Sequence, residues 1–130
     1  MPVTWKIRGS VLLVTLVGEC GDEPVDAIME AVADPEFQTG TSLLLDLRCS
    51  TDNPTVDDFR RRARRIASLL LEGLSSSCSI VIEQQPLQYG LAKMAAAYFG
   101  FQGLEVEIFT DLDEAFRSLA NPAPPKLPGK

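Results

Sequence analysis

The sequence predicts an α/β fold: a five-stranded, mixed but mostly parallel sheet with an antiparallel first edge strand and about four helices. Apolar runs of strand length alternate with segments of helical periodicity from Val11 to Leu119. Capping residues or a proline open these helical segments. The length of 130 residues and a hydrophobic content of 45% suit a domain with one main core.

The first two strands are expected to form an antiparallel hairpin. Residues 3–7 alternate apolar and polar side chains, as in an edge strand with one buried face, and Gly9 and Ser10 provide the turn. Residues 11–17 are almost wholly apolar, as in a strand covered on both faces. In residues 104–108, apolar side chains alternate with two glutamates, and this pattern predicts the second edge strand.

Two further strands and four helices complete the expected order, β-β-α-β-α-β-α-β-α. Buried strands are predicted at residues 43–47 and 79–82. Helices are predicted after Gly21, after the capping signal at Thr55, from Pro86 and after Thr110. The parallel units should have right-handed crossovers. A single domain of residues 1–120 is then followed by residues 121–130, which contain four prolines and are expected to form a disordered tail.

Composition excludes several classes of function. The net charge of −6 argues against general nucleic-acid binding, and no apolar run reaches the roughly 18–20 residues of a membrane span. The N-terminus shows no signal-peptide pattern. Three widely spaced cysteines fit free thiols in a reducing cytoplasm. The absence of histidine removes the commonest general base and metal ligand, so we expect no enzyme, no cofactor and no metal.

A ligand site, if present, is expected beyond the carboxyl ends of the parallel strands. The candidates for ligand binding or a switch at this edge are Asp46, Cys49, Ser50, Thr51, Thr55 and Glu83. Helix capping alone also accounts for Asp22, Thr55 and Thr110. Asp46 is either an exposed carboxylate or one bonded to loop amides. Asp46 and Glu83 lack the nucleophile or histidine that acid–base catalysis would want beside them.

The helix from Pro86 offers a candidate interaction face. Its apolar side chains at helical spacing are expected to face the core: Leu87, Leu91, Met94, Ala95 and Tyr98. The outward face would then carry Tyr89, Ala92 and Ala96, which suits a homodimer or a protein partner. An ordinary surface is the alternative. The arginines of residues 60–65 are either a rival surface for an acidic partner or a solvated helix face.

Three stretches carry a family resemblance: residues 40–48 (GTSLLLDLR), 88–94 (QYGLAKM) and 108–116 (IFTDLDEAF). They resemble the STAS-like superfamily with the SpoIIAA-like fold, in its small bacterial STAS/SEC14-like branch. The resemblance implies a non-enzymatic cytoplasmic module that binds a protein partner and is switched by phosphorylation of a Ser-Ser pair. Thr55 matches the first serine of that pair, whereas Val56 replaces the second. The SEC14-like side of the resemblance implies a small apolar ligand.

Two classes of function remain, a regulatory protein-interaction module and a binder of a small or lipid-like molecule. An apolar pocket under residues 49–55 would favour the binder. A filled core with a flat adjoining surface would favour the interaction module.

Overall fold

A computed structural model describes residues 3–120, and the predicted tail at residues 121–130 lies outside the described residues. The elements follow the predicted order. They are β1 (Val3–Arg8), β2 (Val11–Gly18), α1 (Glu23–Val32), β3 (Ser42–Ser50), α2 (Val56–Ser68), the 3₁₀ helix η1 (Leu69–Glu72), β4 (Ser77–Val81), α3 (Pro86–Phe101), β5 (Glu105–Phe109) and α4 (Leu112–Ala120).

The strands form one sheet in sequential order, β1-β2-β3-β4-β5. β1 is antiparallel to β2, and the remaining neighbours are parallel. The two strands with alternating patterns, β1 and β5, lie at the edges of the sheet. An edge strand has a partly exposed face, so polar residues alternate with its apolar ones. The predicted fold class is therefore confirmed.

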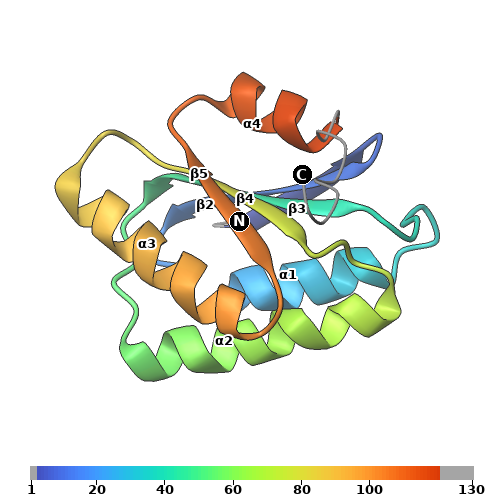
Figure 1. Ribbon diagram of the computed structural model, residues 1–130, viewed down its shortest axis with the longest axis horizontal. Helices are drawn as coiled ribbons and strands as arrows, with labels where there is room; N and C mark the ends of the chain where they lie inside the picture. Colours follow the sequence, from blue (N-terminus) through green and yellow to red (C-terminus); the bar gives the residue numbers. More distant parts are fainter. Residues whose placement is uncertain (1–2, 121–130) are drawn as a thin grey trace, which may run out of the picture.

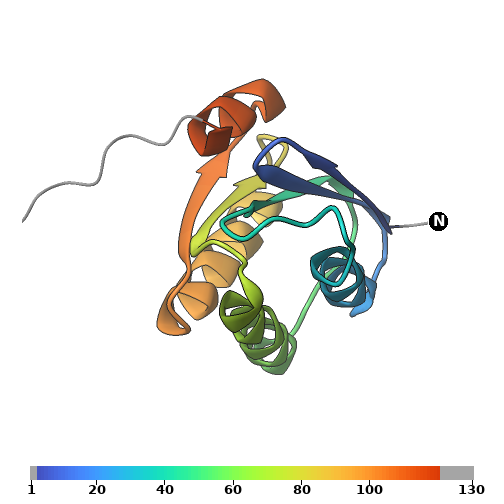
Figure 2. The ribbon, with the colours of Figure 1, turned by 90° about the vertical axis from the view of Figure 1, so that its right-hand side faces the viewer.

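The described helices divide unequally between the two faces of the sheet. α1, α2 and α3 cover one face, and α4 lies on the other (Figures 1 and 2). The larger core lies between the sheet and the first three helices. A smaller core under α4 consists of Val11, Leu44, Val81, Ala115 and Leu119. Alternate residues of β3 therefore enter different cores, and this explains its uninterrupted apolar run from Leu43 to Leu45.

Local signals fix the ends of α2. The Thr55 side chain accepts the Asp58 amide at 3.2 Å, and the Asp58 carboxylate accepts the Thr55 amide at 2.9 Å. This is the predicted capping box, with Asp in place of the commoner Glu. At the other end, α2 tightens into η1 and stops at Gly73, whose φ of +111° is accessible to glycine at little cost.

The orientation of α3 differs from the prediction. Ala92 is 1% exposed and belongs to the core, whereas Leu87 is 69% and Met94 37% exposed. The predicted outward position of Ala92 is therefore wrong, as are the inward positions of Leu87 and Met94. The buried face of α3 consists of Ala92, Ala95 and Phe99. The two alanines allow the helix to lie close to the sheet, while Leu87 and Met94 are turned toward solvent.

Candidate ligand pocket

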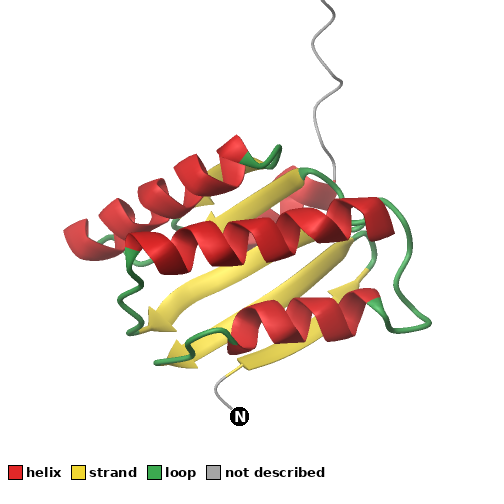
Figure 3. Ribbon diagram, turned by 90° about the horizontal axis from the view of Figure 1, so that it is seen from below, coloured by secondary structure: helices red, strands yellow, loops and turns green. Residues whose placement is uncertain are grey.

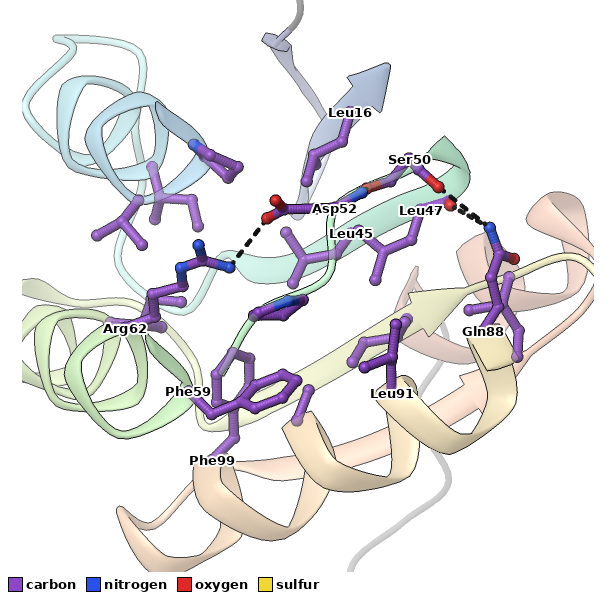
Figure 4. A pocket seen from close by; sticks show the side chains of 18 residues that line it. Leu16, Leu45, Leu47, Ser50, Asp52, Phe59, Arg62, Gln88, Leu91 and Phe99 are labelled. Carbon is purple, nitrogen blue, oxygen red and sulfur yellow. Dashed lines mark hydrogen bonds and ion pairs between the residues drawn. The ribbon is translucent and has the colours of Figure 1, made fainter. Parts of the chain in front are cut away.

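A pocket of about 110 Å³ lies between the sheet and the layer formed by α1, α2 and α3 (Figure 4). Apolar side chains make up most of its wall. The sheet and the residue that follows β4 contribute Leu16, Leu45, Leu47, Ile80 and Ile82, and the helices contribute Pro24, Val25, Ile28, Phe59, Ile66, Leu91, Ala95 and Phe99. The remaining lining residues come from or face the β3–α2 segment: Ser50, Asp52, Pro54, Arg62 and Gln88.

The position of α2 explains why this space is open. α2 packs mainly against α1 and α3 and stands off the strands, so that it bridges its two neighbours (Figures 2 and 3). Phe59 and Ile66 point from α2 toward the sheet and fill part of the gap. Protein interiors contain few voids larger than a water molecule, so the unfilled remainder is a distinct feature of this core.

A β-bulge shapes the upper wall of the pocket. Thr15 pairs with Asp46, but Val17 pairs with Cys49, so Leu16 opposes two residues of β3. The extra residue reverses the alternation of side chains along the strand. Leu47 and Ser50 consequently both line the pocket although they are three residues apart. Cys49, which would otherwise point inward, is exposed.

Charged side chains close the mouth of the pocket. Arg62 of α2 donates from Nη1 to Asp52 at 3.2 Å and from Nε to Asp22 at 3.0 Å. Arg61 also donates to Asp22, at 3.0 and 3.2 Å. The hydrogen bond from Arg61, followed by that from Arg62, holds the pKa of Asp22 below its usual value. These bonds tie the start of α1, the β3–α2 loop and α2 together.

Gln88 connects the opposite side of the mouth to β3. Its Oε1 accepts the Glu83 amide at 2.7 Å, and its Nε2 donates to the Leu47 carbonyl at 3.1 Å. The carbonyls of Arg48 and Ser50 lie at 3.4 Å from the same nitrogen. One amide side chain therefore satisfies the irregular backbone at the end of β3 and holds the first turn of α3 against it (Figure 4).

The polar groups at the mouth are already paired with one another. Asp52 pairs with Arg62, and Gln88 bonds the backbone. Ser50 Oγ accepts the Asp52 amide at 3.3 Å. Among residues 3–120, no buried side-chain nitrogen or oxygen lacks a hydrogen-bond partner, and no three acidic or cysteine side chains gather as a metal site. The pocket therefore offers apolar surface and shape, without a spare charge for a ligand.

Of the six predicted ligand or switch residues, Ser50 lines the pocket and Asp46 does not. Asp46 is 7% exposed and, by the alternation of β3, points to the face of the sheet that carries α4. Its carboxylate accepts from Nε and Nη2 of Arg48, both at 2.9 Å, and from the Arg48 amide at 3.2 Å. Of the two alternatives for Asp46, the structure shows the bonded one, here stabilising the backbone at the bulge.

The other four candidates do not line the pocket. Cys49 is exposed. The Thr51 amide donates to the Gly18 carbonyl at 3.0 Å, and Thr55 caps α2. Glu83 is exposed. Sequence reasoning does not place Asp52, Arg62 and Gln88 at a ligand pocket. Arg62 stands out only within the arginine run of residues 60–65, and no local pattern reveals its pairing with Asp22, 40 positions away.

Comparison with known proteins shows similarity at the level of structure. No protein-family model matches the chain, and no curated protein matches it. An anti-sigma factor antagonist from Mycobacterium paratuberculosis superposes with a TM-score of 0.60 and 16% identity, covering 92% of this chain and 93% of that one. A protein with a SpoIIAA-like fold from Shewanella loihica gives a TM-score of 0.56 and 17% identity, covering 90% and 91%.

This chain has the SpoIIAA-like fold. The STAS-like resemblance of the sequence is thereby confirmed for the fold, in which a mixed five-stranded sheet carries its helices in these positions. Within the part of the chain that the structure describes, no helix is long and apolar enough to cross a membrane.

Proposed function

We propose that this protein is a non-enzymatic regulatory module of the STAS-like type that binds a small, neutral, apolar molecule. The observation that carries the proposal is the apolar pocket under the β3–α2 loop. An apolar cavity of about 150 Å³ is known to stay dry and to take up benzene, so a pocket of about 110 Å³ suits a small aromatic or a short alkyl group. Carboxylates fit less well, because Arg62 is already shared between two aspartates.

Thermal stabilisation by a graded set of probes tests the proposal. The set comprises benzene, indole, hexanol and benzoate. A neutral apolar probe at about ten times its Kd should stabilise the folded protein by about 1.4 kcal/mol, which raises the Tm by about 5 °C for a domain of this size. Benzoate should stabilise much less, since the ion must lose its hydration in an apolar site.

Two matched leucine variants identify the site. Leu47→Phe adds bulk inside the pocket, whereas Leu13→Phe adds the same bulk to the partly buried surface under α4. Stabilisation by indole should disappear in Leu47→Phe and persist in Leu13→Phe. Equal stabilisation of both variants, or no stabilisation of the parent by any apolar probe, would contradict the proposal.

Protein interaction is the second candidate function. It is favoured by exposed apolar side chains on α3, among them Leu87 and Phe101. The similar fold of a protein named as an anti-sigma factor antagonist also supports it. Its test is cross-linking in cells of the native host, in which one partner should be recovered in stoichiometric amount. Recovery of no partner under conditions that trap known complexes of the same cells would count against it.

A further inference from the structure

α3 carries an apolar stripe that its own domain only partly covers. Its members are Leu87, Leu91, Met94, Tyr98 and Phe101, which we call the α3 seam. They follow one another at intervals of four, three, four and three residues, the spacing of a helix face that packs against another helix. Leu87, Met94 and Phe101, each seven residues apart, are 69%, 37% and 80% exposed. Exposed apolar groups in this regular order indicate a contact surface.

The two inner members of the seam are held in place by the core. Leu91 lines the ligand pocket. The Tyr98 ring stacks on Phe59 of α2 with centroids 6.0 Å apart and planes 4° apart, and the Phe101 ring meets Tyr98 edge-on at the same centroid distance. Because Tyr98 is already held against Phe59, this ring loses little conformational entropy when a partner binds.

The C-terminal end of the seam borders a hollow of about 220 Å³. Its lining residues come from α2, α3 and the residue that follows α3: Arg60, Ala63, Arg64, Tyr98, Phe101 and Gln102. A hollow beside an exposed aromatic ring can accept a projecting side chain of a partner. A flat or convex apolar surface would lack this feature.

Arginines lie at the C-terminal end of the seam, on a protein whose net charge is −6. α3 contains no acidic residue, and its one charged residue is Lys93. Arg60 is 3.8 Å from the exposed Asp57, a weak pair in solvent. Within residues 3–120, Arg64 has no ion-pair partner, whereas Arg61, Arg62 and Arg65 are bound to aspartates. The Arg60 guanidinium also lies over the Tyr98 ring, 5.8 Å from its centroid. Within the described part of the chain, Arg60 and Arg64 are therefore the α2 arginines without a close carboxylate partner, and they remain able to pair with a carboxylate of another protein.

We infer that the α3 seam docks an amphipathic helix of a partner protein, with apolar side chains along one face and acidic side chains on its flanks. The seam extends over 14 residue steps, about 21 Å, so a partner helix of about four turns covers it. Its apolar face would interlock with Leu87, Met94 and Phe101, and its carboxylates would meet Arg60, Arg64 and Lys93. The inference rests on the second candidate function, and it does not require that a ligand occupies the pocket.

Charge distinguishes this partner from two other occupants. A second copy of the chain, packed with its α3 parallel to the first across a twofold axis, would place Arg60 and Arg64 of one seam near those of the other. An anionic membrane would be repelled by the rest of a protein with six excess negative charges. A separate acidic helix meets neither obstacle.

Selection from a displayed library tests the inference. The library consists of helical peptides of about three heptads with leucine along one face and randomised flanking positions. Selection uses the whole folded chain, and each selected peptide is then measured against variants whose folding has been checked by thermal denaturation. We expect peptides rich in Asp and Glu, which lose about tenfold or more in affinity against Phe101→Ser and against Arg64→Glu.

Two controls separate the seam from other surfaces. Leu71→Ser changes another highly exposed apolar side chain, 92% exposed on η1, and should leave binding unchanged. Leu47→Phe, which fills the ligand pocket, should also leave it unchanged. Equal binding to Phe101→Ser and the parent would mean that the peptides bind another surface. This result would overturn the inferred role of the α3 seam but not the proposal that the protein binds a protein partner. Selection of no peptide, or of basic peptides, would also overturn it.

Two further measurements address the other occupants. The parent should remain monomeric in analytical ultracentrifugation and should not bind vesicles of phosphatidylserine and phosphatidylcholine. Self-association or vesicle binding that is lost in Phe101→Ser would overturn the inference in favour of a second copy or a membrane.

Discussion

Truncation of two leucines on the same strand tests whether the pocket is open space in the folded protein. Leu43 and Leu45 lie two residues apart on β3 and point into the same core. Leu43 is fully buried away from the pocket, whereas Leu45 forms part of the pocket wall. The substitutions Leu43→Ala and Leu45→Ala therefore remove the same three carbons from a filled site and from a site beside a void.

The two sites should differ in the cavity contribution to stability. Loss of three carbons costs about 2.4 kcal/mol in transfer free energy at about 0.8 kcal/mol each. A new enclosed cavity adds about 24 cal/mol per Å³, so a cavity of about 65 Å³ adds about 1.6 kcal/mol. The total cost of Leu43→Ala is then about 4 kcal/mol. Leu45 already lacks neighbours on its pocket side, so fewer contacts are lost and we expect about 2.5 kcal/mol.

Equilibrium urea unfolding measures both values on protein refolded from denaturant, so that no bound ligand is carried through purification. The difference of about 1.5 kcal/mol is larger than the usual extrapolation error for a domain of this size. An equal or larger cost for Leu45→Ala would refute the reasoning, since it would mean that the space beside Leu45 is filled.

Three other outcomes follow from the structure. Hydrogen bonds from the Thr55 amide and Arg61 lower the pKa of Asp58 from its usual 3.8 to about 2. Because this pKa is lower in the folded than in the unfolded protein, the ionised Asp58 stabilises the fold above about pH 4, and this stabilisation is lost as the pH falls through about 2. The urea midpoint of Asp58→Asn should therefore decline less than that of the parent across this range. A thiol reagent should label Cys49 rapidly in the folded protein and all three cysteines in urea, because Cys20 and Cys78 are buried and burial raises the pKa of Cys78 to about 12; rapid labelling of Cys78 in the folded state would contradict its burial. Gln88→Leu should cost about 1–3 kcal/mol and abolish amide-exchange protection at Glu83, whose amide Gln88 accepts at 2.7 Å; unchanged protection would show that this bond is unimportant.

The position of Asp46 illustrates how tertiary structure decides between two alternatives that the sequence leaves open, an exposed carboxylate and one bonded to backbone amides. The bulge between β2 and β3 leaves the Arg48 amide near the Asp46 carboxylate, and the Arg48 side chain completes a bidentate pair. A bulge depends on the pairing of two strands, and the pairing partner of Asp46, Thr15, is 31 positions away.

The rotation of α3 has a similar origin. Helical periodicity identifies a stripe of large apolar residues, and a stripe of that kind usually faces the core. In this protein Ala95 is buried as expected, but Ala92 and Phe99 complete the buried face, and Leu87 and Met94 are exposed. The distance between helix and sheet decides which set fits, and that distance is set by all the elements packed in the layer.

The sequence by itself determined the element order and the capping of α2, because hydrophobic periodicity and capping act over a few neighbouring residues. It also indicated the strand order, because alternating patterns mark β1 and β5 as edges and continuous apolar runs mark the strands between them. Only the tertiary structure decided the pocket, its mouth and the exposed seam. The pocket exists because α2 bridges α1 and α3 above the sheet, and its mouth pairs Arg62 with Asp22 and Asp52 across three segments. Such features depend on the relative placement of packed elements, which no local pattern encodes.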